Sequence, residues 1–207
     1  ALDSVFMSHR LNKSFGAQTQ YRMPMSNNLL TMPASIMDRL NKPAQIVHLK
    51  EKETYNFIKE VQKCALKPQD QKSIDRLFIL IEDQQIFSFF EEIENTKKKL
   101  SQKATAPFNF YYPDLETNEI FSMIEFQTWS EKIKTEIFQA LDRCLLQAQL
   151  KESDIDYVFL TGGTAHVPFI QSEFARRFPA ERMQTKNFFH SILSGLIESS
   201  RAWEELK

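Results

Sequence analysis

The spacing of apolar positions divides the chain into helices and short strands. Apolar residues recur every three or four positions over 3–15, 34–40, 51–66, 70–81, 84–103, 129–148, 169–178 and 188–206, which predicts amphipathic helices. Strand patterns cover 46–49, 108–112, 120–126, 158–160 and 183–185, and turn formers at 116–118 predict a hairpin. Gly16 is placed to end the first helix, residues 16–35 look irregular, and Ser194 and Gly195 fall inside the last helix.

Two of the four glycines of the chain stand side by side, Gly162 and Gly163, at the end of the strand pattern 158–160. Adjacent glycines permit positive φ and the close approach of another group. Pro168 suits the first turn of the helix that follows. A ligand such as a nucleotide or phosphate would bind here, because ligands of open α/β sheets lie at the carboxyl ends of strands. Taken alone, the pair favours a tight turn without a ligand.

A second feature is a row of polar residues in the predicted helix 84–103. Glu94, Lys97, Lys98 and Ser101 fall at i, i+3, i+4 and i+7 and therefore share one helix face. A carboxylate, two ammonium groups and a hydroxyl in one row could hold a ribose and a purine. The alternative is a solvated face with a local Glu94–Lys98 ion pair, and the spacing alone favours that interpretation.

Composition narrows the classes of protein. Of 207 residues, 42% are hydrophobic and 12% aromatic, which is typical of a folded globular protein. The net charge of −1 argues against nucleic-acid binding, and the lack of an apolar run of roughly 18 residues argues against a membrane span. Cys64 and Cys144 are isolated and are interpreted as buried or half-buried thiols of a reducing, cytoplasmic compartment without a zinc site. The start at Ala1 indicates a piece of a longer protein.

From residue 84 onward, the order of elements and two separated motifs resemble a known family. Phe159-Leu160-Thr161-Gly162-Gly163-Thr164, continuing to Pro168-Phe169-Ile170, is similar to the adenosine motif of the heat shock protein 70 chaperones, within the actin-like ATPase superfamily. The segment 94–101 is similar to the purine-side helix of that family, and Ala1-Leu2-Asp3 to the segment after its second phosphate turn. The chain is identified as a divergent, bacterial-type relative of the C-terminal half, or adenosine-side lobe, of the nucleotide-binding domain.

The resemblance implies an α/β fold, as a lobe fragment of an actin-like ATPase (ribonuclease H-like) with an inserted helix-plus-β-hairpin subdomain. Residues 1–20 would form a leading helix joining two subdomains. Residues 21–128 would form the helical and hairpin subdomain on the purine side, in which about 20–80 are a non-family insertion. Residues 129–207 would form the α/β subdomain with the adenosine motif.

The resemblance also implies a binding role for ATP or ADP, with Mg²⁺ in the parent protein. Gly162, Gly163 and Thr164 would bring backbone close to the nucleotide, Glu94 and Lys97 would bond the ribose, and Ser101 the purine edge. Lys98 and His166 stand where two arginines usually sandwich the adenine, which implies a weaker clamp. Phe189 stands where an aspartate is usual.

The family's phosphate turns and catalytic carboxylates are not found in this sequence, so the resemblance implies no catalytic residues here and no ATP hydrolysis by the chain alone. The expected partners are the nucleotide, the N-terminal ATPase lobe, and protein clients or co-chaperones in a stress response. The alternative is a nucleotide-free helical interaction module that has kept the actin-like fold. A hydrolase using His166 or His190 has no recognisable nucleophile context.

Overall fold

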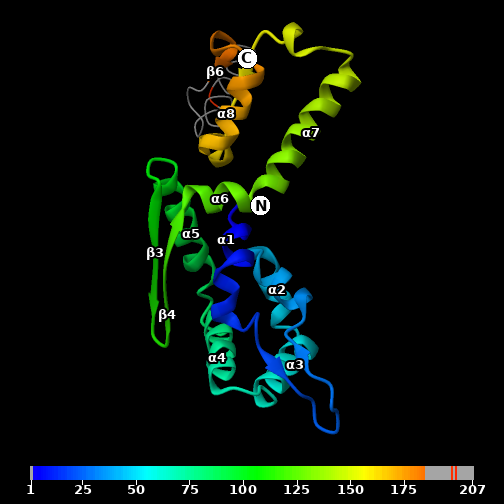
Figure 1. The fold of residues 1–207 in the computed structure, drawn as a ribbon, viewed down its shortest axis with the longest axis vertical. Coiled ribbons are helices and arrows are strands. Elements are labelled where there is room, and N and C mark those ends of the chain that lie inside the picture. The colour runs from blue at the N-terminus through cyan, green and yellow to red at the C-terminus, as the bar shows by residue number, and fades with distance from the viewer. Residues whose placement is uncertain (1, 185–196, 198, 200–207) are drawn as a thin grey trace, which may run out of the picture. The chain divides into compact units, whose positions relative to one another are not determined.

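The computed structural model describes residues 2–184, 197 and 199, and it divides into two compact units, residues 1–130 and 131–207, each described here by itself (Figure 1). The first unit contains the α-helices α1 (Ser4–His9), α2 (Ala34–Leu40), α3 (Lys52–Lys63), α4 (Pro68–Glu82), α5 (Ile86–Leu100) and α6 (Met123–Trp129). Its strands are β1 (Gln20–Tyr21), β2 (Leu30–Thr31), β3 (Thr105–Tyr112) and β4 (Leu115–Ser122), and its 3-10 helices cover Leu11–Phe15 and Pro43–Leu49. The second unit contains α7 (Glu131–Ala148), β5 (Val158–Phe159), α8 (Pro168–Arg177) and β6 (Met183–Gln184), with 3-10 helices at Glu152–Asp154, Gly163–His166 and Ala180–Arg182.

An aromatic core holds the first unit together. Phe6 of α1 packs against Phe121 and Phe126 at ring-centroid distances of 5.0 and 4.8 Å. Phe89 of α5 lies 5.1 Å from Phe108 of β3, and all five of these rings are fully buried. The core therefore joins α1 and α5 to the β3–β4 hairpin and α6, which fixes the helix that carries the polar row.

The antiparallel hairpin β3–β4 is buried on one face only. Ala106, Phe108 and Phe110 point inward, whereas Asn109 and Tyr111 between them are exposed. This alternation is the two-residue period of a strand with one solvated face. The inward face packs on α5, which runs beside β3 in Figure 1.

The predicted hairpin boundaries were wrong at two places. The turn lies at residues 113–114, between the paired Tyr112 and Leu115, and Asp114 adopts the left-handed φ of 58° that aspartate tolerates. The predicted turn 116–118 is instead part of β4. The predicted strand 120–126 ends at Ser122, because a capping box between Ser122 and Glu125 starts α6 there.

The capping box gives a testable contribution to stability. Ser122 Oγ accepts a hydrogen bond from the Glu125 backbone N–H at 3.2 Å, and the Glu125 carboxylate accepts one from the Ser122 N–H at 3.0 Å. We expect Ser122→Ala to lower the free energy of unfolding by about 1 kcal/mol, the usual cost of losing an N-cap. Urea unfolding of both proteins measures this, with the exposed Thr128→Ala in the same helix as control. A cost no larger than that of Thr128→Ala would contradict the assignment.

The same box makes this contribution depend on pH. The hydrogen bond from the Ser122 hydroxyl lowers the pKa of Glu125 most, with help from the Ser122 backbone N–H and from Arg10. A carboxyl whose pKa is lowered by folding stabilises the folded state above its unfolded pKa, and this stabilisation is lost as pH falls through the folded value. The difference between wild type and Ser122→Ala should therefore shrink on acidification below about pH 4.5, the ordinary glutamate pKa.

The segment between β1 and α3 differs from the sequence prediction in two ways. Residues 16–35 are not wholly irregular, because β1 and β2 pair antiparallel within them. Residues 46–49 form the end of a 3-10 helix rather than a strand, with Pro43 at its start. Ile46 and Leu49 are buried three positions apart, which matches the three-residue turn of a 3-10 helix and not the two-residue period of a strand.

The first and last helical predictions also changed in detail. The predicted helix 3–15 is broken at Arg10 into α1 and a 3-10 helix, which ends at Gly16 with a φ of 86° as expected. The predicted helix 129–148 begins at Glu131, after the buried Ser130. The helix predicted over 188–206, with Ser194 and Gly195, lies outside the described residues apart from the helical Ile197 and Ser199.

The second unit has a two-stranded parallel sheet and two main helices. β5 and β6 pair at Val158 with Met183 and at Phe159 with Gln184, which confirms both strand predictions within the described residues. Phe138 of α7 lies 4.9 Å from Phe174 of α8 between ring centroids. Phe138 is buried in α7. Cys144 on the same helix is exposed, contrary to prediction, whereas Cys64 is half-buried as predicted.

Candidate functional site

The Gly162–Gly163 turn follows β5 directly in the second unit. Gly162 has φ 81° and ψ 169°, a conformation that is essentially restricted to glycine, and its carbonyl accepts a hydrogen bond from Ala165 at 3.1 Å. Gly163 opens the 3-10 helix Gly163–His166, after which Pro168 begins α8. The predicted order of strand, glycine turn and helix is therefore confirmed.

The described residues leave open space around both glycines. A Cβ built on Gly162 or Gly163 would meet no atom of the described residues within 4 Å. Gly162, Gly163 and Thr164 are exposed, whereas Ala165 is buried and His166 is half-buried. The conformation of Gly162 explains one glycine, but neither the backbone angle nor the packing of the described residues of the second unit requires a glycine at 163.

Two arginines fix the chain that leads into this turn. Arg177 at the end of α8 bonds Glu152 at 2.5 Å and Asp142 of α7, and its guanidinium carbon lies 5.7 Å from the centroid of the Phe138 ring. Arg182 donates to the carbonyls of Ser153 and Ile155 at 2.7 and 2.9 Å. These bonds tie the connection before β5 to the end of α8 and to the segment before β6.

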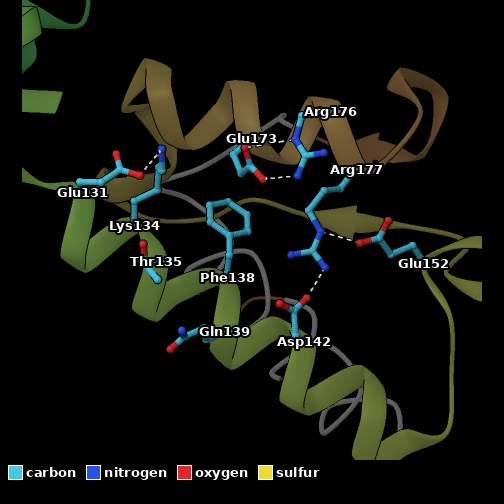
Figure 2. Close-up of a pocket in the computed structure, with 10 residues that line it drawn as sticks. All are labelled: Glu131, Lys134, Thr135, Phe138, Gln139, Asp142, Glu152, Glu173, Arg176 and Arg177. Carbon is cyan, nitrogen blue, oxygen red and sulfur yellow. Dashed lines mark hydrogen bonds and ion pairs between the residues drawn. The ribbon is translucent and has the colours of Figure 1, made fainter. Parts of the chain in front are cut away.

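A polar groove of about 560 Å³ lies between α7 and α8 beside this cluster (Figure 2). Its charges are paired with one another: Glu131 with Lys134 at 2.8 Å, Glu173 with Arg176 at 2.6 Å, and Arg177 with two carboxylates. The hydrogen bond from Arg176 holds the pKa of Glu173 below its usual range. Burial alone would lower the pKa of Arg177, yet its two acidic partners raise it overall. Of these pairs, the one between Arg177 and Asp142 joins α8 to α7, whereas Glu131–Lys134 and Glu173–Arg176 each lie within a single helix.

The polar row lies at the C-terminal end of α5 in the first unit. Glu94 pairs with Lys98 at 3.1 Å, with side chains 49% and 60% exposed, so the local ion pair that the sequence offered as an alternative is present. The Lys97 ammonium lies 2.6 Å from the Asp3 carboxylate, and its side chain is only 12% exposed. Ser101 Oγ donates to the Lys97 carbonyl at 3.2 Å. The predicted helix is present, with Glu94, Lys97 and Lys98 within α5 and Ser101 directly after its last residue.

The eight candidate residues therefore form two groups. Those of α5 belong to the first unit and those of the glycine turn to the second, and each unit is described by itself. Phe189, which stands at the position of the family's aspartate, lies outside the described residues. That the two groups form one cleft stays a prediction.

Sequence reasoning missed the residues that hold these two groups. Asp3 and Lys97 are 94 positions apart, and an aspartate just before a helix is ordinarily interpreted as its cap. Arg177 ends α8 and Arg182 follows it, and neither belongs to a sequence motif. The sequence does show basic residues near the ends of these helices. Such residues are favourable there because of the helix dipole, so their presence does not indicate a distant partner.

Two other kinds of site are missing from the part of the chain that the structure describes. No group of three or more His, Cys, Asp or Glu side chains there could hold a metal ion. None of the described helices combines the length and the apolar character needed to cross a membrane.

The fold and the glycine turn define a class of α/β protein. Its first unit consists of helices and a hairpin, and its second unit contains a strand, a glycine turn and a helix in that order. A sequence model described as "Hsp70 protein" matches residues 67–189, which is more than half of the chain and includes both groups of candidate residues. The chain belongs to the Hsp70 family, which confirms the resemblance; the bacterial type stays a prediction. The family implies the actin-like ATPase fold, and the mixture of helices and small sheets agrees with part of that fold.

Several fungal heat shock proteins are similar to this chain. They include a heat shock protein homolog of Saccharomyces cerevisiae, 28% identical over 104 residues, and a heat shock protein homolog of Lachancea kluyveri, 26% identical over the same length. Heat shock protein hsp88 of Neurospora crassa is 27% identical over 104 residues. Each alignment covers 49% of this chain and 15% of the relative, so the chain spans a small part of those proteins.

Proposed function

We propose that this chain contributes the adenosine-binding side of an ATP/ADP cleft in an Hsp70-like chaperone. The observation that carries the proposal is the open space that the described residues leave at Gly163, where their packing does not require a glycine. A ligand that approaches the backbone closely gives a reason for the missing side chain. The position of the turn after a parallel strand supports the same conclusion, because ligands of α/β sheets bind at that end of the strands.

The residues of α5 would provide the polar contacts. Glu94 and Lys97 would bond the ribose hydroxyls, and Ser101 would bond the purine edge. Lys98, which is largely exposed, and His166 would lie against the faces of the adenine. A lysine ammonium is a point charge and does not stack as a planar guanidinium does, so this adenine clamp would be weaker than a pair of arginines.

In the full-length protein, a second ATPase lobe would supply the phosphate contacts and hold Mg²⁺. Closure around the nucleotide would shift the equilibrium between two lobe arrangements, because a ligand favours the state that it binds more tightly. Protein clients or co-chaperones in the cytoplasm would respond to that shift. The chain alone would not hydrolyse ATP.

Substitution at Gly163 tests the nucleotide site directly. We expect Gly163→Ala in the full-length protein to reduce ADP affinity by about tenfold or more, since a methyl group would meet the nucleotide, which corresponds to ~1.4 kcal/mol. Isothermal calorimetry with ADP and ATP measures this loss. Lys98→Ala and His166→Ala should each weaken binding, while Lys99→Ala serves as control because Lys99 pairs with Glu92 away from the row. Unchanged affinity in the Gly163, Lys98 and His166 variants would remove the proposed site.

A nucleotide-free interaction module is the second candidate function. It is favoured by the polar row itself, because Glu94, Lys97 and Ser101 all have partners within the chain. The region before residue 67, outside the family match, also exposes apolar side chains, among them Met25 and Leu29. If this function is correct, the full-length protein gives no calorimetric signal with ADP or ATP. It should instead capture a protein partner, and the capture should be lost when residues 22–30 are replaced by a Gly/Ser linker.

A further inference from the structure

The contact between Asp3 and Lys97 joins the start of the first unit's sequence to the C-terminal part of α5. The Lys97 Nζ lies 2.6 Å from Asp3 Oδ1, across 94 positions of sequence. The Lys97 side chain is 12% exposed and that of Asp3 33% exposed, so the pair is largely shielded from water. Shielded ion pairs with short contacts fix side chains more firmly than exposed ones such as Glu94–Lys98.

Asp3 occupies a position where its carboxylate would ordinarily serve its own helix. It is the N-cap residue of α1, and aspartate at that position usually accepts a hydrogen bond from the second or third backbone N–H of the helix. Within the described part of the chain, its side chain makes no such capping bond. The backbone angles of Asp3, φ −69° and ψ −32°, are helical rather than the extended ones of a capping aspartate, and its carboxylate bonds Lys97 of α5 instead of its own helix.

Both helices that the pair joins are fixed by other contacts. Phe6 of α1 is fully buried in the aromatic core. The last turns of α5 are held by Thr96 Oγ1, which donates to the Pro107 carbonyl of β3 at 3.3 Å, and by the buried side chains of Ile93 and Leu100. The Asp3–Lys97 contact is thus not needed to attach α5 to the unit. What it adds is a fixed position for one ammonium group.

We propose that Asp3 is a positioning residue that holds the Lys97 ammonium ready for the ribose of a bound adenine nucleotide. This inference rests on the proposed function. A lysine side chain has four rotatable bonds and loses up to about 2 kcal/mol of conformational entropy when it is ordered. Asp3 orders it before the nucleotide arrives, so less affinity is lost on binding. An ammonium group has three N–H donors, and one bond to Asp3 leaves donors for the ligand oxygens.

The experiment is a double-mutant cycle in the full-length protein, read by ADP calorimetry. Asp3→Ala should weaken ADP binding about fivefold, and Lys97→Ala by at least as much. Adding Asp3→Ala to Lys97→Ala should cause no further loss, because Asp3 acts only through the ammonium. A general structural role of Asp3 would instead give additive losses. Glu92→Ala is the matched control, because it removes an ion pair from the neighbouring Lys99 of the same helix.

A second measurement separates positioning from general damage. The preference for ADP over 2′-deoxy-ADP should fall in Asp3→Ala and stay unchanged in Glu92→Ala, and Asp3→Glu should restore part of it. If the wild-type protein binds ADP but Asp3→Ala keeps both affinity and preference, the positioning role is wrong and the proposed function stands. If the wild-type protein binds no adenine nucleotide, the proposed function fails and this inference with it.

Discussion

Replacing Phe89 by alanine should lower the free energy of unfolding of the first unit by about 3–5 kcal/mol, the usual cost of removing a buried phenyl ring. Phe89 is fully buried in α5, and its ring lies 5.2, 5.1 and 4.9 Å from the rings of Phe15, Phe108 and Phe110. Three edge-on neighbours leave a cavity that cannot close without moving β3 or the 3-10 helix after α1. This substitution also tests whether the core supports the helix end that carries the polar row.

The matched control lies two positions away. Phe87 is in the same helix but is 67% exposed, so Phe87→Ala should change the free energy of unfolding by no more than about 0.5 kcal/mol. Urea unfolding followed by tryptophan fluorescence, in a Trp203→Phe background, reports on Trp129 of the first unit. Equal losses for the two variants would show that the described packing around α5 is wrong.

Replacing Gly162 by alanine should destabilise the second unit by about 1–3 kcal/mol, because side chains other than hydrogen are strained in its backbone conformation. The glycine has φ 81° and ψ 169°, and open space around it offers no relief from strain that arises within the residue itself. Gly163→Ala, one position further, should be nearly neutral for stability. Hydrogen exchange of the amides of β5 and α8, measured by mass spectrometry, distinguishes the two variants.

The contrast between these neighbouring glycines also separates folding from binding. Gly162→Ala should speed exchange in the second unit without nucleotide, whereas Gly163→Ala should leave exchange unchanged and act only on nucleotide affinity. If both variants speed exchange equally, the second glycine is required by the fold, and the main support for an adenosine site is removed.

The helices of this chain were predictable where one apolar face meets the core. The pattern of Ile86, Phe89 and Ile93 indicated α5 to within a few residues, and the short helix at 34–40 was predicted with the bounds that α2 has. Residues 46–49 were assigned the wrong period, because a short apolar run does not distinguish a strand from a 3-10 helix. At 120–126, local capping by Ser122 overrode the strand pattern.

The candidate site was predictable in composition but not in its contacts. The helical spacing placed Glu94, Lys97 and Lys98 on one face, and the glycine pair was placed correctly after its strand. The sequence could not indicate the partner of Lys97, because a bond across 94 positions leaves no local pattern. The arginine contacts around β5 depend on tertiary structure in the same way. The meeting of the two groups stays a prediction.

The position of α1 has a consequence during synthesis on the ribosome. Arg10, just after α1, bonds Glu125, which is 115 positions later in the chain, and Phe6 packs on residues of the same distant region. At translation rates of roughly 5–20 residues per second, these partners emerge about 6–23 s after the helix does. During that interval Phe6 lacks its native partners Phe121 and Phe126, so this part of the nascent chain would need protection from aggregation.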